Sequence, residues 1–144
     1  MFRGKERFAC ALKALDRREF ASAETGFTEL LLQSLSLTER AFLLNKRGVA
    51  RIGLELRELA QADFTAALDS VGDYPPALTN LGNLLLEDGE VETAIVQYER
   101  AIASDREYAI AYLNLGVAYK RAGRIDEAVR SLRQAQRLEQ RKAR

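Results

Sequence analysis

Histidine and tryptophan are absent from this chain of 144 residues, and cysteine occurs once. Without histidine, the chain lacks the side chain that most often acts as a general acid or base and as a neutral metal ligand. The sequence also contains no Gly-rich phosphate loop, no pair of nucleophile and base, and no cluster of metal ligands. We therefore expect no catalytic activity, no bound metal and no cofactor.

A long apolar run is missing as well. No segment approaches the roughly 20 apolar residues that cross a bilayer. Lys5, Glu6 and Arg7 interrupt the start of the chain, which is not the pattern of a secretory signal. The single cysteine, Cys10, cannot form an internal disulfide and fits a reducing compartment. We expect a cytoplasmic protein without membrane contact, in which Cys10 is a small buried core residue; a reactive thiol is the alternative.

Proline occurs only at Pro75 and Pro76, so nearly the whole chain is free to be helical. What the sequence does contain is a regular repeat, most visible at the equally spaced Gly48, Gly82 and Gly116. A fixed period of this size, about 34 residues, is typical of a stacked array whose units cannot bury their apolar faces alone. Three further series keep the same interval: Ala60, Ala94 and Ala128; Phe64, Tyr98 and Leu132; Ala67, Ala101 and Ala135.

Each unit has the pattern of two helices, because apolar residues recur three and four positions apart on either side of a short polar turn. A glycine inside a helix costs about 1 kcal/mol relative to alanine, so its recurrence indicates a close contact between two helices. We expect Gly82 and Gly116 to permit that approach. The large residue at Tyr98 or Leu132 is expected to fill the space toward the neighbouring unit.

The residues at these positions resemble the tetratricopeptide repeat family, whose repeating unit of the same length is a pair of helices. Residues 75–108 match the family's pattern nearly as well as residues 109–142 do. The resemblance implies an all-α fold: a right-handed superhelical solenoid of antiparallel helix pairs, with about four repeats. We expect a single domain over residues 1–144, with repeats at approximately 4–40, 41–74, 75–108 and 109–142. The best-matching unit places Tyr112, Leu115, Gly116, Tyr119, Ala128, Leu132 and Ala135 at the family's positions.

Two units depart from the family's pattern. In residues 41–74, Arg47 and Arg51 stand where the family has leucine and tyrosine. Glu55 replaces the turn glycine of that unit, so we expect its first helix to run longer. The divergent unit 4–40 lies three residues farther from its neighbour than the regular period requires, which predicts a longer connection near residues 35–38. Terminal repeats diverge because one of their faces meets water.

The leading hypothesis for function is a non-catalytic scaffold or adaptor that binds a peptide segment of a partner. In this family the concave face, lined mainly by first helices, receives such a segment. Asparagine offers a donor and an acceptor together, so Asn80 and Asn114, one period apart, suit pairing with an extended backbone. Two alternatives stay open: the asparagines satisfy the array's own backbone, and the apolar members are covered by neighbouring helices. By register, the groove positions, expected to be exposed, are Phe42, Asn45, Lys46, Val49, Asn80, Asn83, Leu86, Asn114, Val117, Lys120 and Arg121.

One specific site of the family is excluded. Members that clamp a chaperone's C-terminal carboxylate place Lys and Asn in one first helix, Asn in the next, and Lys with Arg in the third. Here Asn45 and Val49 stand at the first two positions, and Ile110 and Asn114 at the last two. Only Asn80 fits that pattern.

The charge distribution supports an alternative function, which is self-assembly through the ends of the chain or through its acidic middle and basic C-terminus. Residues 55–107 hold three Lys or Arg against twelve Asp or Glu, and residues 120–144 hold nine against three. The sequence disfavours nucleic acid as a partner, since no aromatic residue lies among the C-terminal arginines. If Val129, Leu132 and Leu138 are partly bare at the open C-terminal end, a dimer would cover them.

Overall fold

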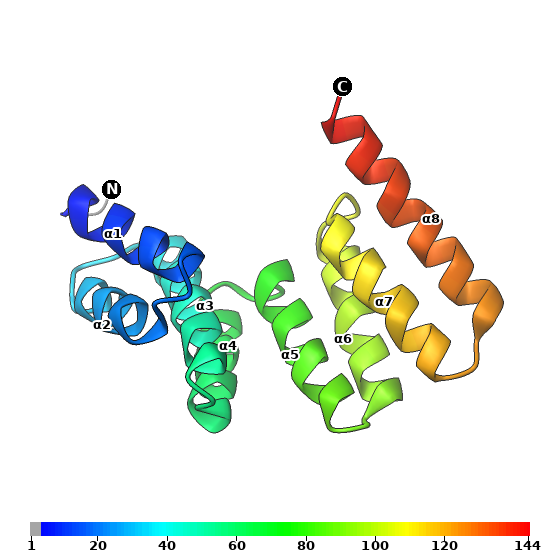
Figure 1. Cartoon of the computed structure of the whole chain (residues 1–144), viewed down its shortest axis with the longest axis horizontal. Helices are drawn as coiled ribbons and strands as arrows, with labels where there is room; N and C mark the ends of the chain where they lie inside the picture. Colours follow the sequence, from blue (N-terminus) through cyan, green and yellow to red (C-terminus); the bar gives the residue numbers. More distant parts are fainter. Residues whose placement is uncertain (1–3) are drawn as a thin grey trace. The chain divides into compact units, whose positions relative to one another are not determined.

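The computed structural model describes residues 4–144, and these residues form α-helices joined by short connections (Figure 1). The helices make four consecutive pairs, and a turn of three residues joins the two members of each pair. So short a turn makes the paired helices antiparallel neighbours. The prediction of an all-α fold built from helix pairs is confirmed. The helices are α1 (Lys5–Asp16), α2 (Phe20–Leu31), α3 (Leu37–Gly53), α4 (Arg57–Val71), α5 (Pro75–Glu87), α6 (Val91–Ser104), α7 (Ala109–Arg121) and α8 (Ile125–Lys142).

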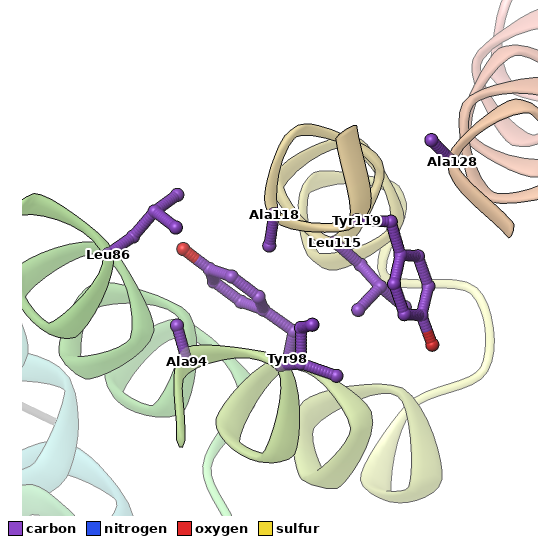
Figure 2. Close-up of a cluster of buried hydrophobic side chains, with 8 residues drawn as sticks. Leu86, Ala94, Tyr98, Leu115, Ala118, Tyr119 and Ala128 are labelled. Carbon is purple, nitrogen blue, oxygen red and sulfur yellow. The ribbon is translucent and has the colours of Figure 1, made fainter. Parts of the chain in front are cut away.

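The chain divides into two compact units, Met1–Gly72 and Asp73–Arg144. In the first unit, Phe27, Leu30 and Leu43 are buried in a core shared by α1, α2 and α3. In the second unit, Tyr98 and Leu115 anchor a core shared by α5, α6, α7 and α8, which Figure 2 shows at close range. Each core therefore combines residues of two helix pairs, as expected for units that cannot bury their apolar faces alone.

The turns inside the four pairs share one geometry. In each of them one residue has a positive φ: Arg18 at 62°, Glu55 at 61°, Gly89 at 81° and Gly123 at 78°. The residue that follows donates its backbone N–H to a carbonyl five residues earlier, for example Glu90 to Leu85 at 2.9 Å. Such a bond closes a helix end at which the residue just before the donor is left-handed. The first interval between these turns is three residues longer than the next two, which confirms the register read from the sequence.

Replacing Glu55 with glycine is expected to stabilise the chain by about 0.5–1 kcal/mol. A left-handed conformation strains a residue that carries a Cβ, and glycine removes that strain at some cost in unfolded-state entropy. Urea unfolding followed by circular dichroism measures the change. Gly89→Ala is the matched control, with an expected loss of similar size, because a Cβ there meets nothing within 4 Å and adds only backbone strain. A loss of stability in Glu55→Gly would show that the glutamate side chain itself holds the turn.

The third helix is longer than its counterparts, but at the other end from the one predicted. α3 has 17 residues against 13 in α5, and both helices end in the same register. The extra turn lies at the start of α3, where Ser36 and Glu39 cap it reciprocally with hydrogen bonds of 3.1 Å. The three additional residues before the second repeat are therefore largely helical, and α3 begins one turn before residue 41.

The recurring glycines pack against the large residue of their own pair. A Cβ added to Gly82 would lie 2.5 Å from Cε1 of Tyr98, and one added to Gly116 would lie 2.7 Å from Cδ2 of Leu132. The close approach predicted for these glycines is confirmed. In the second unit Tyr98 also reaches the neighbouring pair, since it shares a buried cluster with Leu115 of α7.

An ionic cluster occupies the place of the missing leucine and tyrosine in the second pair. We call Glu24, Thr28, Arg47, Arg51 and Asp63 the Asp63 cluster. Asp63 accepts two hydrogen bonds from Arg47, at 2.9 and 2.7 Å, and one from Arg51 at 3.0 Å. Arg51 also donates to Glu24 at 2.8 Å, and Arg47 to Thr28 at 3.4 Å. The cluster joins α2, α3 and α4, with the Asp63 side chain only 4% exposed.

Two other expectations concern single residues. Cys10 is exposed, so its predicted place in the core is wrong. The next residue, Ala11, is the buried one, and it lies against Gly26, where an added Cβ would stand 2.9 Å away. Of the three apolar residues considered at the C-terminal end, Leu138 is buried, whereas Val129 and Leu132 are exposed. Within residues 4–144, no helix has the length and apolar composition of a membrane span.

Candidate peptide-binding surface

A small pocket lies between the first helices of the second unit, α5 and α7. It has a volume of about 260 Å³, and both helices contribute to its wall. Four of its five lining residues are polar, which makes it a site for hydrogen bonding rather than for apolar burial. The lining residues are Asn83, Leu86 and Glu87 from α5, with Asn114 and Arg121 from α7.

A short chain of hydrogen bonds orders the two asparagines. The Tyr98 hydroxyl donates to Oδ1 of Asn83 at 2.6 Å, and Nδ2 of Asn114 donates to the same oxygen at 3.0 Å. Both lone pairs of that oxygen are therefore engaged. The Nδ2 group of Asn83 and the Oδ1 atom of Asn114 hold no hydrogen bond within residues 4–144. One amide donor and one amide acceptor are thus left on two half-buried side chains of the same pocket.

The tyrosine that holds Asn83 keeps its proton at any physiological pH. Burial raises the pKa of Tyr98 to about 12, while Arg121 lowers it and Glu87 raises it. The hydroxyl therefore remains a donor, and Oδ1 of Asn83 is held as its acceptor. Arg121 itself donates to the backbone oxygen of Leu86 at 3.3 Å, near the end of α5.

The remaining predicted positions of the second unit lie outside this pocket. Asn80 is half-buried on α5, and the asparagine that bonds to Asn114 is Asn83. Val117 and Lys120 are exposed on α7, as predicted. Leu86 lines the pocket but is buried, so its predicted exposure is wrong. It lies one helical turn after Gly82 and joins the core around Tyr98.

The four positions predicted on α3 lie in the first unit. Asn45 is only 5% exposed, which contradicts the prediction, because it shares the buried face of α3 with Ala41 and Gly48. Phe42 is half-buried, with its ring centroid 5.8 Å from that of Phe8. Lys46 and Val49 are partly exposed, and Nζ of Lys46 lies 5.4 Å from the centre of the Phe42 ring. For Phe42, the alternative that a neighbouring helix covers the side chain is correct in part.

The sequence interpretation missed the part played by Tyr98, which it treated only as a packing residue. A buried tyrosine hydroxyl requires a polar partner, and Asn83 lies on the paired helix, one residue after the glycine that faces the ring. That requirement is the signal that could have identified Asn83 rather than Asn80. No three His, Cys, Asp or Glu side chains are placed to hold a metal ion in the described part of the chain.

Descriptions of known repeats match overlapping stretches of the chain. A tetratricopeptide repeat description matches residues 45–101, a TPR repeat description matches residues 82–123, and a second tetratricopeptide repeat description matches residues 109–141. The chain belongs to the tetratricopeptide repeat family. Together the matches cover three of the four helix pairs. They leave out the divergent first pair, whose register is displaced by three residues.

Several solved structures share the fold, among them that of YrrB, which is described as a TPR protein. MamA superposes with a TM-score of 0.76 and 23% identity, over 98% of this chain and 81% of its own. YrrB superposes with a TM-score of 0.68 and 20% identity, over 92% of this chain and 66% of its own. BtubC from P. vanneervenii superposes with a TM-score of 0.76 and 21% identity, over 93% of this chain and 62% of its own. The predicted all-α, tetratricopeptide-like solenoid is thereby confirmed.

Proposed function

We propose that this chain is a non-catalytic interaction scaffold that binds an extended segment of another protein across α5 and α7. The observation that carries the proposal is the open pair of amide groups on Asn83 and Asn114. We place the protein in the cytoplasm, with proteins as its partners. The family's members bind proteins or peptides, and YrrB is described as having an unusual peptide-binding site.

The chemistry of the pocket suits a peptide backbone. Each peptide unit offers one N–H donor and one C=O acceptor. The Nδ2 group of Asn83 and the Oδ1 atom of Asn114 present the complementary donor and acceptor for such a unit. Glu87 and Arg121 add one charge of each sign at the rim of the pocket. Binding of this kind depends on the backbone of the partner and tolerates many side chains.

Replacing Asn114 with alanine is expected to weaken peptide binding about tenfold, the effect of losing one or two hydrogen bonds. Asn83 keeps Tyr98 as its partner in this variant, so the melting temperature should change little. The ligand is selected from a displayed library of random peptides, and its dissociation constant is then measured by calorimetry.

Asn80→Ala is the matched control, because it removes the same side chain from α5 outside the pocket. It should bind the selected peptides as the unchanged chain does. Equal affinity of Asn114→Ala and the unchanged chain, or equal weakening by Asn80→Ala, contradicts the proposed site. Failure to select any peptide with a dissociation constant below about 1 mM contradicts the proposed function itself.

A further inference from the structure

The last helix pair leaves an apolar face uncovered. Ile110, Leu113, Val129 and Leu132 are all exposed, and we call this set the C-terminal face. A hollow of about 340 Å³ lies within it, between α7 and α8, and is lined by Ile110, Leu113 and Leu132 among others. Contiguous apolar side chains of this kind on a soluble protein mark a surface that another element covers.

The same face of the preceding pair is covered, and the structure shows by what. Ile95 and Tyr98 of α6, one period before Val129 and Leu132, are 3% and 0% exposed against 39% and 38%. Leu115 and Tyr119 of α7 lie with them in one buried cluster (Figure 2). The covering element is therefore the first helix of a following pair, which packs on the second helix of the pair before it.

The helix α1 is a first helix whose corresponding face is open. In the register of the repeats, Cys10 and Ala14 stand at the positions of Leu115 and Tyr119. A hollow of about 750 Å³ runs between α1 and α2, and we call it the N-terminal groove. Its floor is made of small side chains, Cys10, Ala14, Ser22 and Gly26 among them, which leave room for bulky ones.

We propose that the C-terminal face of one copy docks in the N-terminal groove of a second copy, as each pair of the array packs on the next. The partner is thus a second copy of this chain, and the contact is heterologous: two different surfaces meet. It is separate from the peptide-binding pocket. Large apolar side chains on one surface meet small ones on the other, which lets the two interdigitate.

Charge favours this arrangement over the symmetric ones. Glu6, Glu19 and Glu29 line the N-terminal groove. Among the lining residues within 4–144, Arg7 is the one basic residue, and its Nη1 atom lies 3.3 Å from Oε2 of Glu29. The C-terminal face is flanked on α8 by exposed arginines at positions 130, 133 and 137, and one carboxylate, Glu139, lines its hollow. Two C-terminal faces together would oppose arginine to arginine, and two grooves would oppose carboxylates across a void. The head-to-tail contact brings the carboxylates of the N-terminal groove to the arginines of the C-terminal face.

Two blocking variants test the contact. Ser22→Trp fills the N-terminal groove at an exposed position, and Leu113→Glu places a carboxylate on the C-terminal face. Sedimentation velocity over a range of concentrations is expected to show self-association of the unchanged chain, weakened by salt. Each variant alone should associate at least about tenfold more weakly. A mixture of the two should form a particle of two chains and nothing larger, because each still offers one intact surface. Circular dichroism and thermal melting confirm that both variants fold.

Disulfide trapping identifies the surfaces that meet. Cys10 is the only cysteine, and Val129 corresponds to Ile95, which clusters with the counterpart of Cys10. Under mild oxidation, Val129→Cys should give crosslinked oligomers. The Cys10→Ser/Val129→Cys variant should not crosslink alone, but should form a dimer when mixed with the unchanged chain. Thr93→Cys, at an exposed position on α6, is the control and should crosslink little.

Three outcomes overturn the proposal. The first is an unchanged chain that stays monomeric up to about 1 mM, which would leave the C-terminal face to another protein. The second is crosslinking of Cys10→Ser/Val129→Cys with itself, which would show a tail-to-tail dimer. The third is a mixture of the two blocking variants that remains monomeric. Peptide binding by a monomeric chain would support the proposed function and contradict the proposed contact between two copies.

Discussion

Replacing Asp63 with alanine is expected to lower the free energy of unfolding by about 3–5 kcal/mol, because it leaves two guanidinium groups without their shared carboxylate. The Arg47 and Arg51 side chains are only 17% and 15% exposed, so water cannot replace the lost partner. Urea denaturation of the full chain, followed by circular dichroism, measures the loss. Asp73→Ala is the matched control: it breaks an ion pair with Arg100 whose two side chains are about half exposed. That pair should contribute at most about 1 kcal/mol.

A second variant separates the charge from the packing. Arg47→Leu with Arg51→Tyr and Asp63→Ala restores the apolar residues typical of the family at the first two positions. Buried ion pairs are commonly no more stabilising than well-packed apolar side chains of similar volume. The triple variant should therefore recover most of the stability that Asp63→Ala loses. A cost below about 1 kcal/mol for Asp63→Ala alone would mean that the arginines find other partners.

Adding one methyl group at Gly82 is expected to destabilise the second unit by about 1–3 kcal/mol, although alanine is the better helix former by about 1 kcal/mol. The new Cβ would lie 2.5 Å from the Tyr98 ring, which is completely buried. Thermal and urea unfolding of Gly82→Ala measure the effect.

Gly116→Ala is the internal comparison. Its Cβ would meet Leu132, a flexible side chain that is 38% exposed and can move aside. It should therefore cost clearly less than Gly82→Ala. Placing Gly82→Ala in a Tyr98→Leu background should remove most of its cost, and the double-mutant cycle isolates the clash. Equal costs at the two glycines would show that the aromatic ring of Tyr98 is not what requires glycine at position 82.

The parts of the fold that follow from the repeat were predictable. The repeat period determines where each pair turns, and the left-handed residues fall at Glu55, Gly89 and Gly123 accordingly. The start of α3 was not predictable from the repeat, since a capping box at Ser36 added a turn that periodicity does not encode. The Asp63 cluster also escaped prediction: the sequence shows two arginines at apolar positions, but their partners lie on two other helices.

The pocket was predicted only in part, for a physical reason. Register identifies which side of a first helix faces away from its partner, which brought Asn83, Asn114 and Arg121 into the candidate set. It does not say how far a neighbouring helix covers that side, so Asn45 and Leu86 were wrongly expected to be exposed. Nor does register reveal that the Tyr98 hydroxyl bonds to Asn83, one of the three asparagines on α5 and α7.

The Asp63 cluster also indicates a role for the divergent first pair, α1 and α2. Arg47, Arg51 and Asp63 belong to the second pair and by themselves carry an excess positive charge. Glu24 of α2 supplies the second carboxylate and makes the set electrically neutral. Without α1 and α2, the two arginines would share only the Asp63 carboxylate, and the remaining positive charge would attract anions from solvent. The first pair therefore shields this positive charge. The hollow between α1 and α2, with small side chains in its lining, then lies at this end of the array.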